Sequence, residues 1–173
     1  MTDPALSIVV WNVEWQLPRS RSADELRRRI YAVNPDIICL TEAYIGFLPD
    51  FGHVVASSPD YGYPIKEGRR KVLLWSREPW RDFDATGDDG MPQGRFVSAR
   101  TGTPIGEIDF VGVCIPWAAA HVSTGRKDRQ RWEDHLQYLT GLNRMLSDRD
   151  RRTIVAGDFN QRIPRRDAPH LVI

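Results

Sequence analysis

The fold of this chain is decided by one stretch near the end of the sequence, Arg152-Thr153-Ile154-Val155-Ala156-Gly157-Asp158-Phe159-Asn160-Gln161-Arg162. Thr153 to Ala156 is a short run of mostly β-branched residues, which is typical of a strand buried on both faces. Gly157 ends the run and allows a close turn. Asp158 and Asn160 follow at a spacing of two, so in extended chain both side chains leave the same face. The pattern predicts an oxygen-rich corner suited to a hard cation and a phosphate, although an ordinary Gly-Asp turn has the same sequence.

Two earlier strands also end in polar residues. Residues 6–10 form a continuous apolar strand, and Asn12 lies where that strand should end. Residues 36–40 form a second buried strand, and Glu42 follows two residues later. Because the carboxyl ends of parallel strands gather at one edge of a sheet, Asn12, Glu42 and Asp158 are predicted to share that edge. The simpler alternatives are a turn amide for Asn12 and a surface carboxylate for Glu42.

Two helices are predicted from capping and periodicity. Ser22 and Glu25 have the spacing of a capping box and open a helix that runs to about Ala32, before Asn34-Pro35 stops it. A strand, helix and strand this close together favour parallel pairing with a right-handed crossover. The second helix is predicted from Lys127 to about Ser147 by an apolar stripe. That stripe consists of Trp132, Leu136, Leu139 and Leu142.

The middle of the chain predicts antiparallel strands. Short apolar runs at 54–56, 71–75, 95–99 and 108–115 are separated by Gly, Pro and Asp clusters, a spacing typical of a meander. The last run ends at Pro116-Trp117, and the following loop carries His121 and Arg126. An exposed position is the expectation for a loop histidine such as His121.

The length of the chain and its 41% hydrophobic residues indicate one globular domain, residues 1–173, with a real core. Its 24 basic and 23 acidic residues nearly balance, so an anionic ligand must be held by a local site. No apolar run reaches membrane-spanning length, and no export signal precedes the first strand. Cys39 and Cys114 lie in apolar runs and are predicted to be buried free thiols. A cytoplasmic protein without membrane insertion is expected.

With these residues in view, the chain resembles the endonuclease/exonuclease/phosphatase superfamily, which has the deoxyribonuclease-I-like fold. The matching pieces occur in the family's order along essentially the whole chain. They are Val10-Trp11-Asn12-Val13, Asp36-Ile37-Ile38-Cys39-Leu40-Thr41-Glu42, Leu73-Leu74-Trp75-Ser76-Arg77, Cys114-Ile115-Pro116-Trp117 and Ala156-Gly157-Asp158-Phe159-Asn160. The resemblance implies a two-sheet α/β sandwich with outer helices and hydrolysis of phosphodiester or phosphomonoester bonds with a divalent metal.

Carried over residue by residue, the resemblance implies a role for each motif residue. Glu42 would bind Mg²⁺, with Mn²⁺ as the alternative ion, and Asn12 would assist at the same site. Asp158 would orient or deprotonate the attacking water, and Asn160 would hold the metal or a phosphate oxygen. Trp117, His121 and Arg126 are the candidates for binding the phosphate-ester substrate. Enzymes that act on nucleic acids, phosphoinositides and sphingolipids share these motifs, and a nuclease-like phosphodiesterase is the expected class.

The chain departs from the family pattern in two places. Many members carry a histidine where this strand has Cys114, and a thiol does not replace an imidazole that contacts phosphate. Members also place an Asp-His pair in a strand well beyond the Gly-Asp-Phe-Asn motif. This sequence stops at Ile173, thirteen residues after Asn160, and His170 is too close in sequence to be that histidine.

We therefore expect a domain without its C-terminal strands, the front part of a longer protein, with little or no phosphodiesterase activity of its own. The alternative from another functional class is a non-catalytic binding domain of the same fold. An unrelated α/β protein with chance motifs is the third interpretation.

Overall fold

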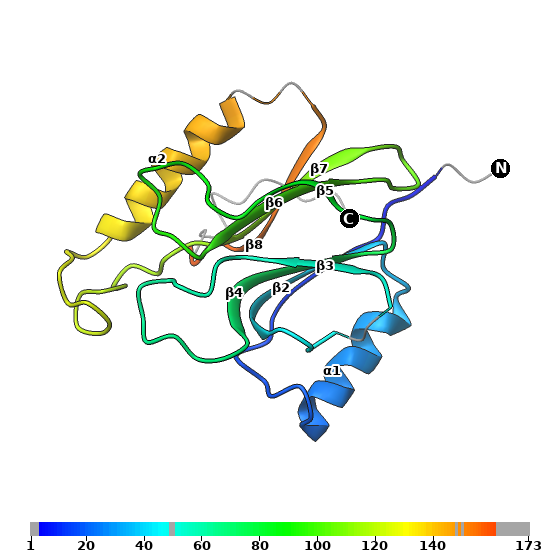
Figure 1. Cartoon of the computed structure of the whole chain (residues 1–173), viewed down its shortest axis with the longest axis horizontal. Helices are drawn as coiled ribbons and strands as arrows, with labels where there is room; N and C mark the ends of the chain where they lie inside the picture. Colours follow the sequence, from blue (N-terminus) through cyan, green and yellow to red (C-terminus); the bar gives the residue numbers. More distant parts are fainter. Residues whose placement is uncertain (1–3, 49–50, 148, 150, 162–173) are drawn as a thin grey trace, which may run out of the picture.

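The computed structural model of the protein describes residues 4–48, 51–147, 149 and 151–161, so His170 lies outside the described part. Two four-stranded sheets face each other, and one helix lies on the outer side of each (Figure 1). This is the two-sheet α/β sandwich with outer helices that the sequence predicted. None of the helices in the described ranges is both long enough and apolar enough to cross a membrane.

The first sheet contains the N-terminal strands in the order β1-β2-β4-β3. β1 pairs with β2 in parallel, as the intervening helix predicted, while β4 pairs antiparallel with both β2 and β3. The elements are β1 Ile8–Asn12, α1 Arg21–Ala32, β2 Ile37–Tyr44, β3 His53–Ala56 and β4 Arg69–Ser76.

The second sheet has the order β5-β6-β7-β8. β5, β6 and β7 pair antiparallel, which confirms the predicted meander, and β8 pairs with β7 in parallel. The elements are β5 Arg81–Asp84, β6 Phe96–Thr101, β7 Ile108–Cys114, α2 Glu133–Ser147 and β8 Thr153–Asp158. Strand β5 was not predicted, because Arg81-Asp82-Phe83-Asp84 has little apolar content and lies largely exposed.

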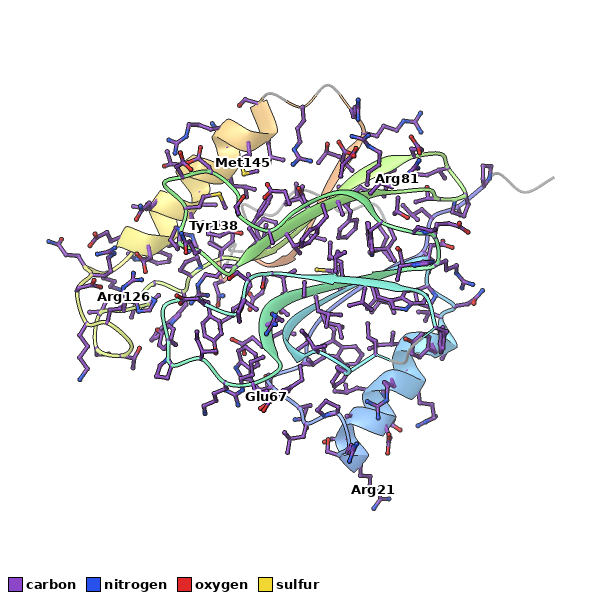
Figure 2. The ribbon with its side chains drawn as sticks, in the orientation of Figure 1. Arg21, Glu67, Arg81, Arg126, Tyr138 and Met145 are labelled. Atoms are coloured by element: carbon purple, nitrogen blue, oxygen red, sulfur yellow. The ribbon has the colours of Figure 1, made fainter. Side chains whose placement is uncertain are left out.

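The core consists of three apolar layers. The first, between α1 and its sheet, includes Ile30, Leu40 and Trp75. The second fills the space between the sheets, and both free cysteines, Cys39 and Cys114, are buried there as predicted. The third lies between α2 and the second sheet, where Tyr138 packs (Figure 2). Burial of both faces of each sheet therefore holds the strand ends in fixed positions.

Both helices begin elsewhere than the sequence predicted. Ser20, not Ser22, caps α1, since its side chain accepts a hydrogen bond from the Ala23 amide. α2 begins at Glu133, and the preceding Trp132 adopts a left-handed backbone outside the helix. The predicted apolar stripe of α2 is wrong at Trp132 and Leu136, which are exposed, whereas Leu139 and Leu142 pack in the core as predicted. The buried residues of α2 are Asp134, His135, Tyr138, Gly141 and Leu142.

Strand β8 also differs from its prediction. It continues through Gly157 to Asp158, so Gly157 does not end it. All six residues are only partly buried, whereas the apolar run predicted burial on both faces. The reason is its position as the last strand of the second sheet, where only β7 pairs with it among the described residues.

Candidate active site

A hydrogen bond between the two sheets joins the two strand ends that the sequence singled out. The Asn12 side-chain amide, at the end of β1, donates from Nδ2 to Asp158 Oδ2 at the end of β8, at 2.9 Å. The other end of the same amide, Asn12 Oδ1, accepts the backbone N–H of Glu14 at 2.9 Å. Asn12 therefore has a fixed orientation and holds the Asp158 carboxylate at the junction of the sheets.

Asp158 and Asn160 form a tight turn instead of an extended pair on one face. Asp158 Oδ1 accepts the backbone N–H of Asn160 at 3.0 Å, and Asn160 has a left-handed backbone with φ of 48°. The Asn160 side chain donates to the carbonyl of Ile115 at 2.8 Å. Both carboxylate oxygens of Asp158 thus accept a hydrogen bond from a neighbouring residue, which fixes the direction of the carboxylate.

Gly157 lets β8 reach this position. Its φ is +141°, and a Cβ atom there would lie 1.9 Å from the carbonyl oxygen of Val113 in β7. A side chain at position 157 is incompatible with the parallel pairing that brings Asp158 opposite Cys114. The glycine of the motif is therefore required by the close approach of two backbones.

Glu42 lies within β2 at an irregular position, not beyond the end of the strand. Its φ is 53°, and the β2–β4 register passes from Thr41 to Ala43 without it. Its carboxylate Oε1 accepts a hydrogen bond from Lys71 Nζ at 2.6 Å, and the two side chains are only 23% and 11% exposed. Unusual backbone conformations of this kind cluster at functional sites.

Four charged side chains act electrostatically on the buried thiol of Cys114. Burial raises the pKa of Cys114 to about 11; the nearby cations Lys71 and Arg95 act to lower it, and the carboxylates Asp158 and Glu42 act to raise it. These four side chains come from four different parts of the chain. Asp158 lies opposite Cys114 in β7, and Glu42 acts electrostatically on the same thiol from the other sheet, so the two carboxylates come from two different sheets and not from the edge of one sheet.

A cavity of about 470 Å³ opens beside Glu42. Its wall combines aromatic and cationic side chains that lie against one another, with Glu42 as the acidic residue. The lining includes Trp15, Tyr61, Tyr63 and Trp117, together with Lys66, Arg69, Lys71 and Arg95. Trp117 is the predicted substrate-binding residue that the structure places here, with 47% of its surface exposed.

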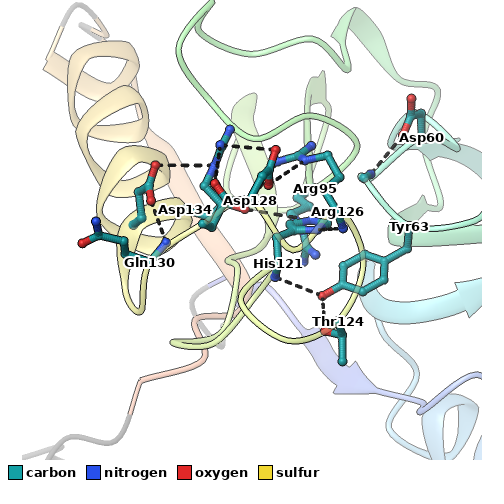
Figure 3. Close-up of polar contacts among 12 residues, drawn as sticks. Asp60, Tyr63, Arg95, His121, Thr124, Arg126, Asp128, Gln130 and Asp134 are labelled. Atoms are coloured by element: carbon teal, nitrogen blue, oxygen red, sulfur yellow. Dashed lines mark hydrogen bonds and ion pairs between the residues drawn. The ribbon is translucent and has the colours of Figure 1, made fainter.

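His121 and Arg126 line a separate cavity of about 190 Å³. His121 is 2% exposed, so the expectation of an exposed loop histidine is wrong. Its Nδ1 accepts the backbone N–H of Arg126 at 3.2 Å, and its ring packs on Tyr63 with 4.4 Å between centroids (Figure 3). Gly62 and Gly125, which have no side chains, leave room for the imidazole. Burial, followed by the charge of Arg126, lowers the pKa of His121, so it is a neutral packing residue.

The model of the Endonuclease/Exonuclease/phosphatase family matches residues 9–172, nearly the whole chain. The chain belongs to that family. No curated protein sequence matches it significantly.

Solved structures of similar fold agree with the family. An AP endonuclease from Archaeoglobus fulgidus has a TM-score of 0.65 and 23% identity, over 90% of this chain and 58% of its own. The 3′ phosphatase NExo from Neisseria, bound to a product DNA hairpin, has a TM-score of 0.61 and 19% identity, with the same coverage. Sphingomyelinase C from Streptomyces griseocarneus has a TM-score of 0.57 and 12% identity, over 91% of this chain and 65% of its own. The chain thus spans less than two thirds of the length of these structures.

The candidate site has a donor set that fits a divalent cation. Mg²⁺ usually takes one or two carboxylates and completes its shell with water and phosphate oxygens. Glu42 and Asp158 are both close to Cys114, and the amide of Asn12 is bonded to Asp158. Within the described ranges, no three His, Cys, Asp or Glu side chains are grouped closely enough to hold a metal by themselves. Glu42 is therefore the main candidate ligand, and the Lys71 ammonium on its Oε1 has to share or release that oxygen.

Several residues of the site were not predicted from the sequence. They are Lys71 in β4, Arg95 directly before β6, and Trp15 and Tyr61 in loops. None of them belongs to a local sequence motif. The rarity of lysine in this sequence was the one available signal for Lys71. The chain has only three, at 66, 71 and 127, and two of them line the cavity beside Glu42.

Proposed function

We propose that residues 1–173 form one domain of a divalent-metal-dependent phosphohydrolase, a nuclease-like phosphodiesterase. The observation that carries this proposal is the hydrogen bond from Asn12 to Asp158, which fixes a carboxylate that acts on the same buried thiol as Glu42, and Glu42 lines a cationic cavity. The Neisseria 3′ phosphatase and the Archaeoglobus AP endonuclease, both of similar fold, support a phosphate ester of nucleic acid as the substrate.

Each residue has a defined part in this proposal. Glu42 holds the metal with help from Asn12, and the metal supplies charge neutralisation at the phosphoryl oxygens. Asp158, oriented by Asn12 and by the Asn160 amide, accepts a hydrogen bond from the attacking water and takes its proton. Asn160 holds the loop after β8 against the Ile115 carbonyl and offers its side-chain oxygen to the site.

The second candidate is a non-catalytic binding domain of the same fold. The observation in its favour is the ion pair of Lys71 with Glu42, because an ammonium already occupies one oxygen of the carboxylate that the metal needs. The two candidates differ first in metal binding. A catalytic site takes up Mg²⁺ or Mn²⁺ through Glu42, whereas a binding domain with a permanent Lys71–Glu42 pair does not.

Titration calorimetry with Mg²⁺ and Mn²⁺ tests this difference. We expect weak binding by the wild-type chain, none by Glu42→Gln, and wild-type binding by Glu107→Gln. Glu107 is an exposed carboxylate that precedes β7, at the opposite end of that strand from Cys114. Equal affinities in all three proteins would mean that Glu42 is not a metal ligand.

Hydrolysis of a phosphodiester tests the second part of the proposal, on the 173-residue chain and on the full product of its gene. We expect little or no activity of the 173-residue chain, whereas the activity of the full product should be lost in EDTA and reduced about 10²–10⁴-fold by Asp158→Asn, the usual contribution of a general base. Metal binding through Glu42 without EDTA-sensitive hydrolysis by the full product would favour the binding domain.

A further inference from the structure

Arg95 is a buried cation that has no carboxylate beside it among the described residues. Its side chain is 2% exposed and lines the cavity beside Glu42. The hydrogen bond it makes within the described ranges is a long one, from Nη1 to the Cys114 carbonyl at 3.4 Å, and no described carboxylate lies within ion-pair distance of it. A charge taken out of water without a partner is destabilising, so its presence indicates a ligand of opposite charge.

Other partly buried arginines of this chain show the contrast. Arg100 donates to Asp109 at 2.8 Å, and Arg129 donates to Asp134 at 2.8 Å. Each has a carboxylate at short range, as is usual when a guanidinium leaves water. Arg95 instead lies over the ring of Tyr61, 6.0 Å from its centroid. Its charge is therefore available to an anion that enters the cavity.

The rest of the cavity wall is suited to a planar ring. Trp15 and Tyr61 stack with their centroids 5.9 Å apart and an angle of 21°, and Tyr63 lies 6.0 Å from Tyr61. Trp117 is half exposed at the cavity and pairs with no other aromatic ring in the described part of the chain. An aromatic face with a cation beside it is the usual surface for a nucleic-acid base and its phosphate.

We propose that this cavity binds an unpaired nucleotide, with its phosphate on Arg95 and its base against Trp117 and Tyr63. The proposal rests on the proposed function, because Glu42 is part of the same cavity wall, and it names the substrate class as single-stranded nucleic acid or a frayed strand end. A base inside a duplex is stacked and cannot enter a cavity. A volume of about 470 Å³ lies in the range of small-molecule sites.

The cationic lining argues against a choline headgroup. Aromatic walls also bind quaternary ammonium groups, but Lys66, Arg69, Lys71 and Arg95 all line this cavity, with Glu42 as the acidic group. The quaternary ammonium of such a headgroup would meet four like charges. A phosphate attached to an uncharged ring meets the complementary charge.

Titration of intrinsic tryptophan fluorescence on the 173-residue chain, in EDTA, tests the proposal. The probes are thymidine 5′-monophosphate, thymidine, inorganic phosphate and sphingomyelin vesicles. We expect the monophosphate to bind at least about tenfold tighter than thymidine or phosphate alone, since a stacked base contributes roughly 1–3 kcal/mol. Trp117→Ala should lose about tenfold in affinity for the monophosphate. Arg95→Met should bind the monophosphate and thymidine equally.

Control variants separate binding from folding. Arg81→Gln removes an exposed guanidinium on the opposite side of the molecule from the Arg126 loop and should bind like wild type (Figure 2). Arg95→Met should unfold at the same temperature as wild type or higher, because it removes an unpartnered buried charge. A lower unfolding temperature with unchanged affinity would make Arg95 a structural residue and overturn the proposal.

Two further results would also overturn the proposal: equal binding of thymidine and its monophosphate by wild type, or tighter binding of the vesicles than of the nucleotide. Because EDTA removes the metal, this experiment is independent of hydrolysis. Nucleotide binding by this chain, together with no metal-dependent hydrolysis by the full product of the gene, would refute the proposed function and leave the cavity assignment intact.

Discussion

Lys71→Met is predicted to strengthen the binding of Mg²⁺. In the metal-free protein the Lys71 ammonium lies 2.6 Å from the Glu42 carboxylate, and the two side chains are mostly buried. A divalent ion on that carboxylate would lie roughly 4 Å from the ammonium, where two unit charges repel by about 1 kcal/mol in a water-like medium. The ion has twice that charge, and the site opens into a cavity, so we take about 2 kcal/mol as the repulsion. Its removal corresponds to about 30-fold tighter binding.

The assay is titration calorimetry with Mg²⁺, accompanied by thermal unfolding. Without metal, Lys71→Met should be less stable than wild type, because Glu42 is left as a partly buried carboxylate without its partner. Mg²⁺ should restore that stability, since an ion that binds the folded state raises its stability by mass action. The matched control is Lys66→Met, which removes the other cavity lysine, an exposed one, and should change the affinity much less.

Unchanged or weaker Mg²⁺ binding by Lys71→Met would refute this reasoning. It would mean that Lys71 orients Glu42 for the metal, or that the metal does not use Glu42. The variant Glu42→Gln distinguishes the two, because it abolishes binding only in the first case.

The remaining predictions concern a histidine and a glycine. His121 has a lowered pKa in the folded protein, so the unfolded chain binds more protons below about pH 6.5, and stability should fall as the pH drops from 7 toward the folded-state pKa. In urea unfolding across pH 5–7.5, the free energy of unfolding of His121→Gln should depend less on pH than that of wild type. His53→Gln, at an exposed position, should keep the wild-type dependence. Parallel curves for all three proteins would contradict this assignment. Gly157→Ala should lower the unfolding free energy by about 4 kcal/mol or more, because its Cβ would meet the Val113 carbonyl at 1.9 Å. Gly102→Ala, whose Cβ would have 3.8 Å to its nearest neighbour, should cost less than about 1 kcal/mol, and equal losses would refute the steric argument.

The layers of the fold were predictable because they follow from the spacing of apolar residues and the lengths of the connections, which are local properties of the sequence. Parallel pairing of β1 with β2 followed from the helix between them, and antiparallel pairing of the middle strands followed from their short connections. Helix starts were less predictable. Ser20 and Ser22 are both capable caps, and the difference lies in which hydroxyl reaches the Ala23 amide. For α2, the left-handed backbone at Trp132 interrupts what the apolar pattern presents as one helix.

The residues of the candidate site likewise fall into those with a local sequence signal and those without one. Asn12, Glu42 and Asp158 were singled out from the sequence because each lies in or at the end of an apolar strand that carries a local motif. Their actual conformations, such as the left-handed backbone of Glu42, depend on pairing with a partner strand and have no sequence signal. Arg95 and Tyr61 have no motif and are brought to the cavity by tertiary packing alone. His121 was misjudged because loop position predicts exposure, whereas two glycines 63 residues apart, Gly62 and Gly125, enclose its ring.

Cys114 stands at a position where many family members carry histidine, and two nearby cations supply positive charge that the thiol does not. A buried thiol with a pKa of about 11 offers no positive charge to a phosphate. Lys71 and Arg95 both lie near enough to act on that thiol, and together they balance the charges of Glu42 and Asp158. Entry of a divalent cation alone leaves this group with excess positive charge, and entry of a phosphate alone leaves it with excess negative charge. Metal and phosphate are therefore expected to favour each other's binding, and because linkage is reciprocal, each should raise the affinity for the other by the same factor.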